Sequence, residues 1–331
     1  MARLVLFRRT KALFSFAIAA LLLPVGVNAQ SALDEIHITP RVDATLASAS
    51  GPGHEATLRI NSNLVLVPVT ITDGMNRVVT GLEQGNFEVL ENKQLQEIRH
   101  FSSQDEPVSI GIIFDASSSM DNKIEWAREA VKNLLDSANP QDEFFLISFA
   151  DQPQLLVDFT NSVEKVQNQM LYLVPKGRTA LLDAVYLGIN KMRDAHYGRR
   201  ALMIISDGGD NRSRYTEAEL KSLVKEADVL VYAAGIYDRN FESVEERRGP
   251  ELLNELSTLT GAQCFVVDNA KQLPSIAKTI GVQLRYQYVL GYRPNKRTGD
   301  STWKKIKVRL KLPKGTPHLG IFAKTGYYSA H

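Results

Sequence analysis

Two patterns of apolar and polar positions alternate along the middle of this chain. Short apolar runs bounded by polar residues, which are typical of buried strands, recur between 108 and 267. Between them lie longer segments in which apolar residues return at the spacing of an amphipathic helix. Strands and helices that alternate in this way predict an α/β fold, with a mostly parallel sheet covered by helices on both faces. We expect this α/β domain to span residues 107–284.

The individual elements of this domain follow from the same patterns. The expected strands are 108–115, 143–150, 154–159, 201–206, 229–236 and 264–267, and the expected helices are 123–138, 162–173, 180–195, one that opens at 216, 250–259 and 271–284. Ser162 is expected to cap its helix, and Thr216 with Glu219 three positions later forms a capping box. In the first helix we expect Trp126 to lie on the apolar side with Ala130.

β-type patterns flank the α/β domain on both sides. The expected strands are 64–72, 87–90 and 95–101 before it, with a hairpin turn at 91–93, and 285–292, 303–312 and 319–324 after it. Pro68 inside the first run predicts an edge strand or a bulge, since proline cannot donate to a ladder. Neither group has enough strands to be stable alone. We therefore predict that residues 57–106 and 285–331 are two halves of one small β-sandwich, into which the α/β domain is inserted.

Basic residues occupy one side of the strand expected at 303–312. Apolar residues face the other side; the basic row is Lys305, Lys307, Arg309 and Lys311. We interpret this row as a solvated face that prevents edge-to-edge aggregation. The alternative is a patch that attracts anions.

The first 29 residues have the pattern of a secretory signal. Basic residues precede an apolar segment at 12–27, and a small-residue cleavage site ends at Ala29. The apolar segment is short for a membrane span of about 20 residues, so we expect cleavage and no stable membrane span. Residues 30–56 are polar and interrupted by prolines and glycines, which indicates a flexible linker. We expect an exported protein, in the periplasm or outside a bacterial cell.

The net charge bears on possible partners, and the cysteine content bears on possible disulfides. The formal net charge is +2, and removing the four basic residues of the first 29, a stretch without acids, turns it to −2. This balance indicates no nucleic-acid partner. The single cysteine, Cys264, excludes an intramolecular disulfide. Because apolar residues follow it directly, we interpret Cys264 as a core residue rather than a reactive thiol.

Oxygen-bearing side chains follow the strand at 108–115. Asp115 ends this strand, and Ser117 and Ser119 come at alternate positions after it. The carboxyl ends of strands in an open α/β sheet are where ligands collect, and carboxylate and hydroxyl oxygens suit Mg²⁺, Ca²⁺ or Mn²⁺. Two further donors are available downstream: Thr179 stands at a helix start, and Asp207 follows the strand at 201–206.

The order and spacing of these five residues resemble the metal-ion-dependent adhesion site of von Willebrand factor A domains. The residues are Asp115, Ser117, Ser119, Thr179 and Asp207. The flanking segments further resemble the acidobacterial VWFA-related domain proteins, and integrin β subunits show a similar domain insertion. The resemblance implies a doubly wound, Rossmann-like fold and a bound Mg²⁺, or else Mn²⁺ or Ca²⁺. It also implies that the two serines bind the ion directly, while a protein partner supplies an acidic side chain to an open coordination position.

The expected function is therefore metal-dependent protein–protein interaction or adhesion, without enzyme activity. One alternative is a structural envelope protein whose ion only stabilises loops. Another is a Mg²⁺-dependent hydrolase: phosphatases of the haloacid-dehalogenase type also begin with an aspartate at a strand end, but they need a second aspartate where this chain has Ser117. The sequence contains neither G-x-S-x-G nor G-x-x-x-x-G-K-[ST], and its histidines show no metal-ligand spacing. Asp210 is interpreted as a loop cap.

Overall fold

A computed structural model describes residues 64–207, 209–236, 244–294, 302–313 and 315–329. The predicted signal segment 1–29 and linker 30–56 lie outside these ranges. Among the helices of the described part of the chain, none is both long and apolar enough to cross a membrane.

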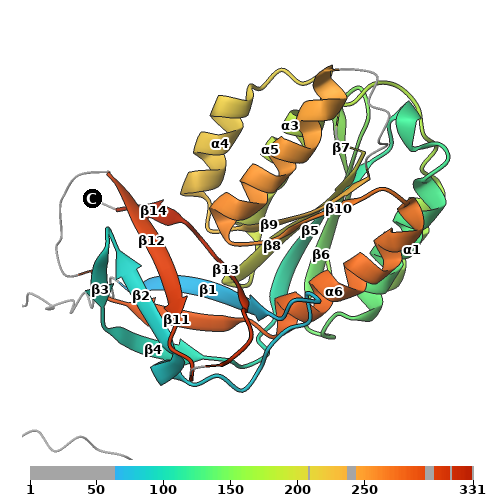
Figure 1. Cartoon of the computed structure of the whole chain (residues 1–331). Helices are drawn as coiled ribbons and strands as arrows, with labels where there is room; N and C mark the ends of the chain where they lie inside the picture. Colours follow the sequence, from blue (N-terminus) through green and yellow to red (C-terminus); the bar gives the residue numbers. More distant parts are fainter. Residues whose placement is uncertain (1–63, 208, 237–243, 295–301, 314, 330–331) are drawn as a thin grey trace, which may run out of the picture. The chain divides into compact units, whose positions relative to one another are not determined.

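The middle of the chain forms a six-stranded sheet in the order β10-β9-β8-β5-β6-β7 (Figure 1). Its strands are β5 (Val108–Asp115), β6 (Glu143–Phe149), β7 (Pro153–Thr160), β8 (Arg199–Ser206), β9 (Leu230–Ile236) and β10 (Cys264–Val267). All pairings in this sheet are parallel except that of β6 with β7. Every residue of β5 is buried, as expected for a central strand covered on both faces. The predicted doubly wound α/β fold is confirmed.

Helices cover both faces of this sheet and enclose two apolar cores (Figure 1). One face carries α1 (Ile124–Asp136), α2 (Val163–Leu171) and α6 (Leu273–Arg285); the other carries α3 (Leu181–Lys191), α4 (Glu217–Glu226) and α5 (Val244–Thr260). Short 3-10 helices are η1 (Gln84–Asn86), η2 (Ser118–Met120), η3 (Met192–Asp194) and η4 (Ala270–Gln272).

The predicted helix caps are confirmed, and one predicted core residue is wrong. Ser162 Oγ accepts the hydrogen bond of Lys165 N, and Thr216 and Glu219 form the capping box. Trp126, by contrast, is 39% exposed. Helix α1 buries the small Ala127 toward the sheet instead, and the Trp126 ring lies beneath the ammonium of Lys271.

The flanking segments form two four-stranded antiparallel sheets, β13-β1-β11-β4 and β14-β12-β2-β3. Their strands are β1 (Val65–Thr72), β2 (Phe87–Glu91), β3 (Gln94–Gln96), β4 (Ile98–Ser102), β11 (Tyr288–Tyr292), β12 (Trp303–Leu310), β13 (Gly320–Ala323) and β14 (Gly326–Tyr328). Each sheet mixes strands from before and after the α/β section, and residues from both segments share one apolar core. The division of the chain into 57–106, 107–284 and 285–331 stays a prediction.

Three local predictions for these strands need comment. The turn between β2 and β3 is confirmed, with Asn92 and Lys93 both at positive φ, as in a two-residue hairpin. The single strand expected at 95–101 is wrong, because β3 and β4 belong to different sheets. The edge-strand prediction for β1 is also wrong, since β1 lies between β13 and β11. Pairing with β13 begins only at Val69, so Pro68 has a paired neighbour on one side only.

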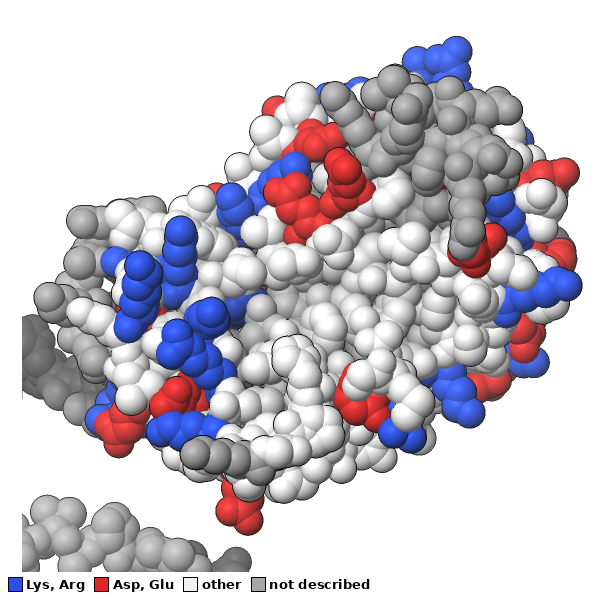
Figure 2. All heavy atoms as spheres, in the orientation of Figure 1, with Lys and Arg blue, Asp and Glu red and all other residues white. Residues whose placement is uncertain are grey.

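The alternation expected in β12 is present. Ile306 and Val308 are buried, whereas Lys305, Lys307 and Arg309 are exposed. Figure 2 shows Lys and Arg side chains gathered over the part of the sandwich that contains β12. Among the described strands, β14 pairs with Trp303–Lys305 alone, so the later half of β12 has β2 as its one described paired neighbour. This arrangement agrees with a solvated face beside an open strand edge.

Candidate metal centre

The candidate site lies where β5 and β8 end. These strands are parallel neighbours, so their last residues, Asp115 and Ser206, meet at the same edge of the sheet. Ser206 Oγ donates to Asp115 Oδ2 at 2.6 Å. Asp207 follows Ser206 directly and is thereby held at this edge.

Four of the five predicted residues form a continuous series of contacts. Asp115 Oδ1 accepts the hydrogen bond of Ser117 N at 2.8 Å. Ser117 Oγ lies 3.0 Å from Ser119 Oγ, and Ser119 Oγ donates to Asp207 Oδ1 at 3.0 Å. The short helix η2 turns the backbone between the two serines, which brings both hydroxyls to the same side. The site therefore gathers two carboxylates and two hydroxyls.

Thr179 reaches the same edge through the backbone of its loop. Lys176 N donates to Ala116 O at 2.9 Å, and Ser118 N donates to Gly177 O at 3.1 Å, so this loop lies against the serine loop. Gly177 has φ +79°, and a Cβ there would lie 2.5 Å from Asp151 Oδ2. Only glycine fits this turn. The Thr179 side chain is buried. Within the described residues, the contacts that hold its loop against the serine loop are backbone hydrogen bonds.

The loop after Asp207 supports Thr179. Asn211 Oδ1 accepts from Thr179 N, and Asn211 N donates to Thr179 O, both at 3.1 Å. Asp210 accepts backbone N–H bonds from Leu182 at 2.9 Å and from Ser213 at 3.1 Å. Asp210 is thus the loop cap that the sequence indicated.

Sequence analysis missed two polar neighbours of the site. One is Ser206, whose position at the end of β8, directly before Asp207, was the available signal. The other is Lys123, whose Nζ lies 2.8 Å from Asp207 Oδ2. Both side chains of this ion pair are largely buried. Nothing in the spacing of Lys123 identifies it, because its contact depends on how its long side chain turns toward β8.

The electrostatics of the site fit a divalent cation. Asp115 is fully buried, and its burial together with the nearby Asp207 carboxylate raises the pKa of Asp115 to about 7. A bound cation would offset this repulsion, and the donors present are the hard oxygens that Mg²⁺ prefers. Within the described ranges no group of three or more His, Cys, Asp or Glu side chains is placed to hold a metal. Besides the two carboxylates, the oxygen atoms gathered here are hydroxyls.

Comparison with known proteins agrees with the fold. Residues 110–209 match the sequence profile described as von Willebrand factor type A domain. A 116-residue stretch is 28% identical to the inter-alpha-trypsin inhibitor heavy chain H4 of Bos taurus, covering 31% of this chain but only 13% of that protein.

Solved structures that align with parts of this chain include two from bacteria. The von Willebrand factor type A protein of Catenulispora acidiphila aligns over 81% of this chain and 75% of its own, with 13% identity and a TM-score of 0.47. The conserved hypothetical protein BatB of Bacteroides thetaiotaomicron aligns over 53% of this chain and 98% of its own, with 19% identity and a TM-score of 0.43. The α/β domain of this chain is a von Willebrand factor type A domain.

Proposed function

We propose that this protein binds a divalent cation at its candidate metal centre and uses the ion to bind a protein partner. Domains of this type are typically interaction modules and commonly hold a divalent metal, which supports a role in protein interaction. The observation that carries the proposal is the series of contacts from Asp115 through the two serines to Asp207. These residues come from two strand ends and offer only oxygen donors.

Each residue has a defined part in this proposal. Ser117 and Ser119 offer neutral hydroxyl oxygens, while Asp115 and Asp207 supply the negative charge. Thr179 offers a fifth oxygen. When bound, the ion supplies a positive docking point for a carboxylate of the partner. Because the protein contributes only two carboxylates, and Lys123 neutralises part of their charge, the ion would keep the positive character that such docking needs. We further propose export directed by residues 1–29.

Calorimetric titration with Mg²⁺ and Mn²⁺ tests the metal site. We expect uptake of one ion by the unaltered protein and none by Asp115→Ala. The matched control is Asp121→Ala, which removes an exposed acid of the same loop that has no assigned role. Metal at 100 times its Kd should also stabilise the fold by about 2.7 kcal/mol in thermal denaturation. Equal uptake by the Asp115→Ala and Asp121→Ala variants would refute the assignment.

A pull-down with and without chelator then separates interaction from mere stabilisation. Partners that are lost both with chelator and in Asp115→Ala support metal-dependent binding. If the ion binds but every partner survives both treatments, the ion serves only to hold the loops, and the structural alternative is correct. A phosphoester hydrolysis assay of the same variants addresses the hydrolase alternative.

A further inference from the structure

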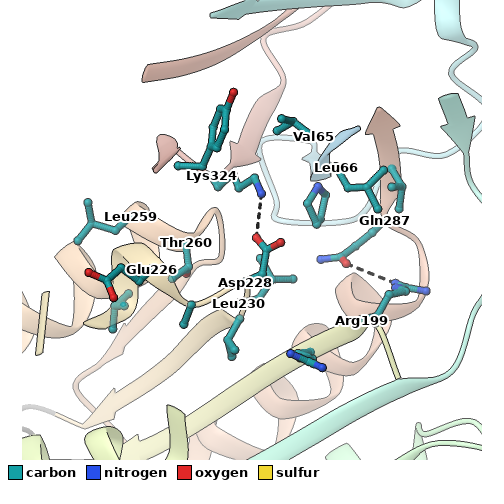
Figure 3. Close-up of a pocket in the computed structure, with 18 of the residues that line it drawn as sticks. Val65, Leu66, Arg199, Glu226, Asp228, Leu230, Leu259, Thr260, Gln287 and Lys324 are labelled. Atoms are coloured by element: carbon teal, nitrogen blue, oxygen red, sulfur yellow. Dashed lines mark hydrogen bonds and ion pairs between the residues drawn. The ribbon is translucent and has the colours of Figure 1, made fainter. Parts of the chain in front are cut away.

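A cavity of about 710 Å³ lies at the opposite edge of the α/β sheet, where β8 and β9 begin. Residues from the sandwich and from the α/β domain line it together (Figure 3). Its apolar wall includes Leu66 of β1, Leu230 of β9 and Leu259 of α5. This volume falls within the range of about 300–1,000 Å³ that is typical of small-molecule sites.

Arg199, the first residue of β8, brings a cation to this cavity. All described acceptors of its guanidinium are uncharged. They are Glu106 O at 3.0 Å, Gln287 Oε1 at 3.3 Å and the carbonyl oxygen of Leu284. Its Nε is buried without a hydrogen-bond partner. Within the described residues, no carboxylate lies within 4.0 Å of Arg199. Burial also lowers the pKa of Arg199, as expected for a charge that has left water.

Three acids act on the charge of Arg199. The carboxylate of Glu106, which lines the same cavity, has the largest effect, although it lies beyond the 4.0 Å of an ion pair. The other two acids are engaged elsewhere. Asp105 pairs with Arg285 at 2.6 Å. Asp142 accepts backbone N–H bonds from Val108 and Asn139 at 2.8 and 2.7 Å. A buried cation without a paired anion is unfavourable, and a bound carboxylate would relieve this cost.

The other charged side chains that line the cavity are Glu106, Arg200, Lys225, Glu226, Asp228 and Lys324. In Figure 3, Arg199 and Gln287 lie at one end, and Glu226 lies at the other. Between them Lys324 and Asp228 form an ion pair at 2.8 Å, so these two charges offset each other. Arg200 is the sequence neighbour of Arg199, and Glu106 is joined to Arg199 by its carbonyl oxygen. This end therefore carries two cations and one carboxylate, a net charge of +1.

We propose that this cavity binds a small organic carboxylate, whose anionic group pairs with Arg199 and whose apolar body lies along Leu66 and Leu230. Arg199 already holds Glu106 and Gln287, which lie on the two chain segments that connect the sandwich with the α/β domain. A ligand here contacts both parts of the protein and stabilises their arrangement. This site is independent of the proposed metal centre.

Calorimetric titration with octanoate, and with octanamide as the uncharged analogue of equal length, tests the proposal. We expect octanoate to bind the unaltered protein at millimolar or lower concentration, and octanamide to bind about tenfold more weakly or less. Octanoate should also raise the midpoint of thermal unfolding.

Two variants locate the site. Arg199→Met removes the proposed counter-ion but also three hydrogen bonds, so Leu66→Glu is the second variant. Leu66 is 43% exposed, and a glutamate there places a like charge at the cavity wall without touching Arg199. Leu95→Glu, at a strand leucine that is 59% exposed and lies outside the cavity lining, is the matched control.

Octanoate should bind Leu66→Glu about tenfold more weakly than Leu95→Glu. Three results would each overturn the proposal: no octanoate binding to the unaltered protein at millimolar concentration, equal binding of octanoate and octanamide, or equal binding by the two leucine variants.

Discussion

Glu91 joins strands that lie before and after the α/β domain in sequence. Its Oε2 accepts hydrogen bonds from the hydroxyls of Tyr292 at 2.8 Å and Tyr327 at 2.9 Å. Glu91 is 8% exposed and lies on β2, whereas the tyrosines lie on β11 and β14. We predict that replacing Glu91 destabilises the whole protein, because the two groups of strands hold together partly through this carboxylate.

The size of the effect follows from these contacts. A hydrogen bond to a charged group contributes about 1.5–3 kcal/mol, so Tyr327→Phe, which removes one bond and keeps the ring, should lower the free energy of unfolding by that amount. Glu91→Ala removes both bonds and leaves the buried Tyr292 hydroxyl without this acceptor. Loss of a buried carboxylate offsets part of this effect, so we expect about 3 kcal/mol for Glu91→Ala. At about 2–4 °C per kcal/mol, the unfolding midpoint should fall by about 6–12 °C.

The assay is urea and thermal denaturation of the single variants and of the double variant Glu91→Ala/Tyr327→Phe. Since both substitutions remove the same bond, the double variant should be no less stable than Glu91→Ala, which gives a coupling energy of about 1.5 kcal/mol or more. Glu88→Ala is the control, because Glu88 faces outward on the same strand and pairs with the exposed Lys311. We expect it to change stability by less than about 1 kcal/mol. A Glu91→Ala variant as stable as Glu88→Ala, or additive single effects, would refute the reasoning.

Three further predictions concern single positions. Gly111→Ala should lower the free energy of unfolding by about 1–3 kcal/mol or more, because a Cβ there would lie 2.2 Å from a ring carbon of Phe145. The control in the same denaturation assay is Gly74→Ala, since a Cβ at Gly74 would have no atom within 4 Å. Gly261→Ala should be at least as destabilising, since Gly261 has φ +85° and a Cβ there would lie 2.2 Å from the backbone of the facing sandwich segment. We expect this variant to lose cooperative unfolding, and unfolding at the wild-type midpoint would contradict the prediction. Cys264 is half-buried against the apolar core, and this desolvation raises its pKa to about 12. The thiol should therefore react more slowly with a disulfide reagent at about pH 8 in the native protein than in denaturant, and equal rates would contradict this prediction.

Periodicity predicted most of the α/β domain because local pattern and tertiary environment agree there. The apolar run at 108–115 is a fully buried strand, and the caps at Ser162 and Thr216 act through residues three positions away. The wrong predictions concern positions at which tertiary contacts, rather than the local sequence pattern, determine the structure. No glycine or proline marks the break at Glu97 that sends β3 and β4 into different sheets. Trp126 has an apolar ring, yet it lies outward because the sheet surface beside α1 accepts the smaller Ala127.

The two ends of β8 show why only part of the candidate chemistry could be predicted. At the carboxyl end, Asp207 follows Ser206 directly, and the parallel pairing with β5 brings the Asp115 carboxylate next to Ser206. Two parallel strands that lie side by side are enough to predict this contact. At the amino end, Arg199 binds backbone carbonyls of distant segments, and no side-chain spacing encodes such contacts. The seven steps of about 3.3 Å from Arg199 to Ser206 separate the two ends by about 23 Å. Two unit charges this far apart interact by less than about 1 kcal/mol at an effective dielectric constant of about 20, so loss of metal binding in Asp115→Ala should change octanoate binding by about fivefold at most. If the two sites prove more strongly coupled, the connection must therefore run through the packed strand itself.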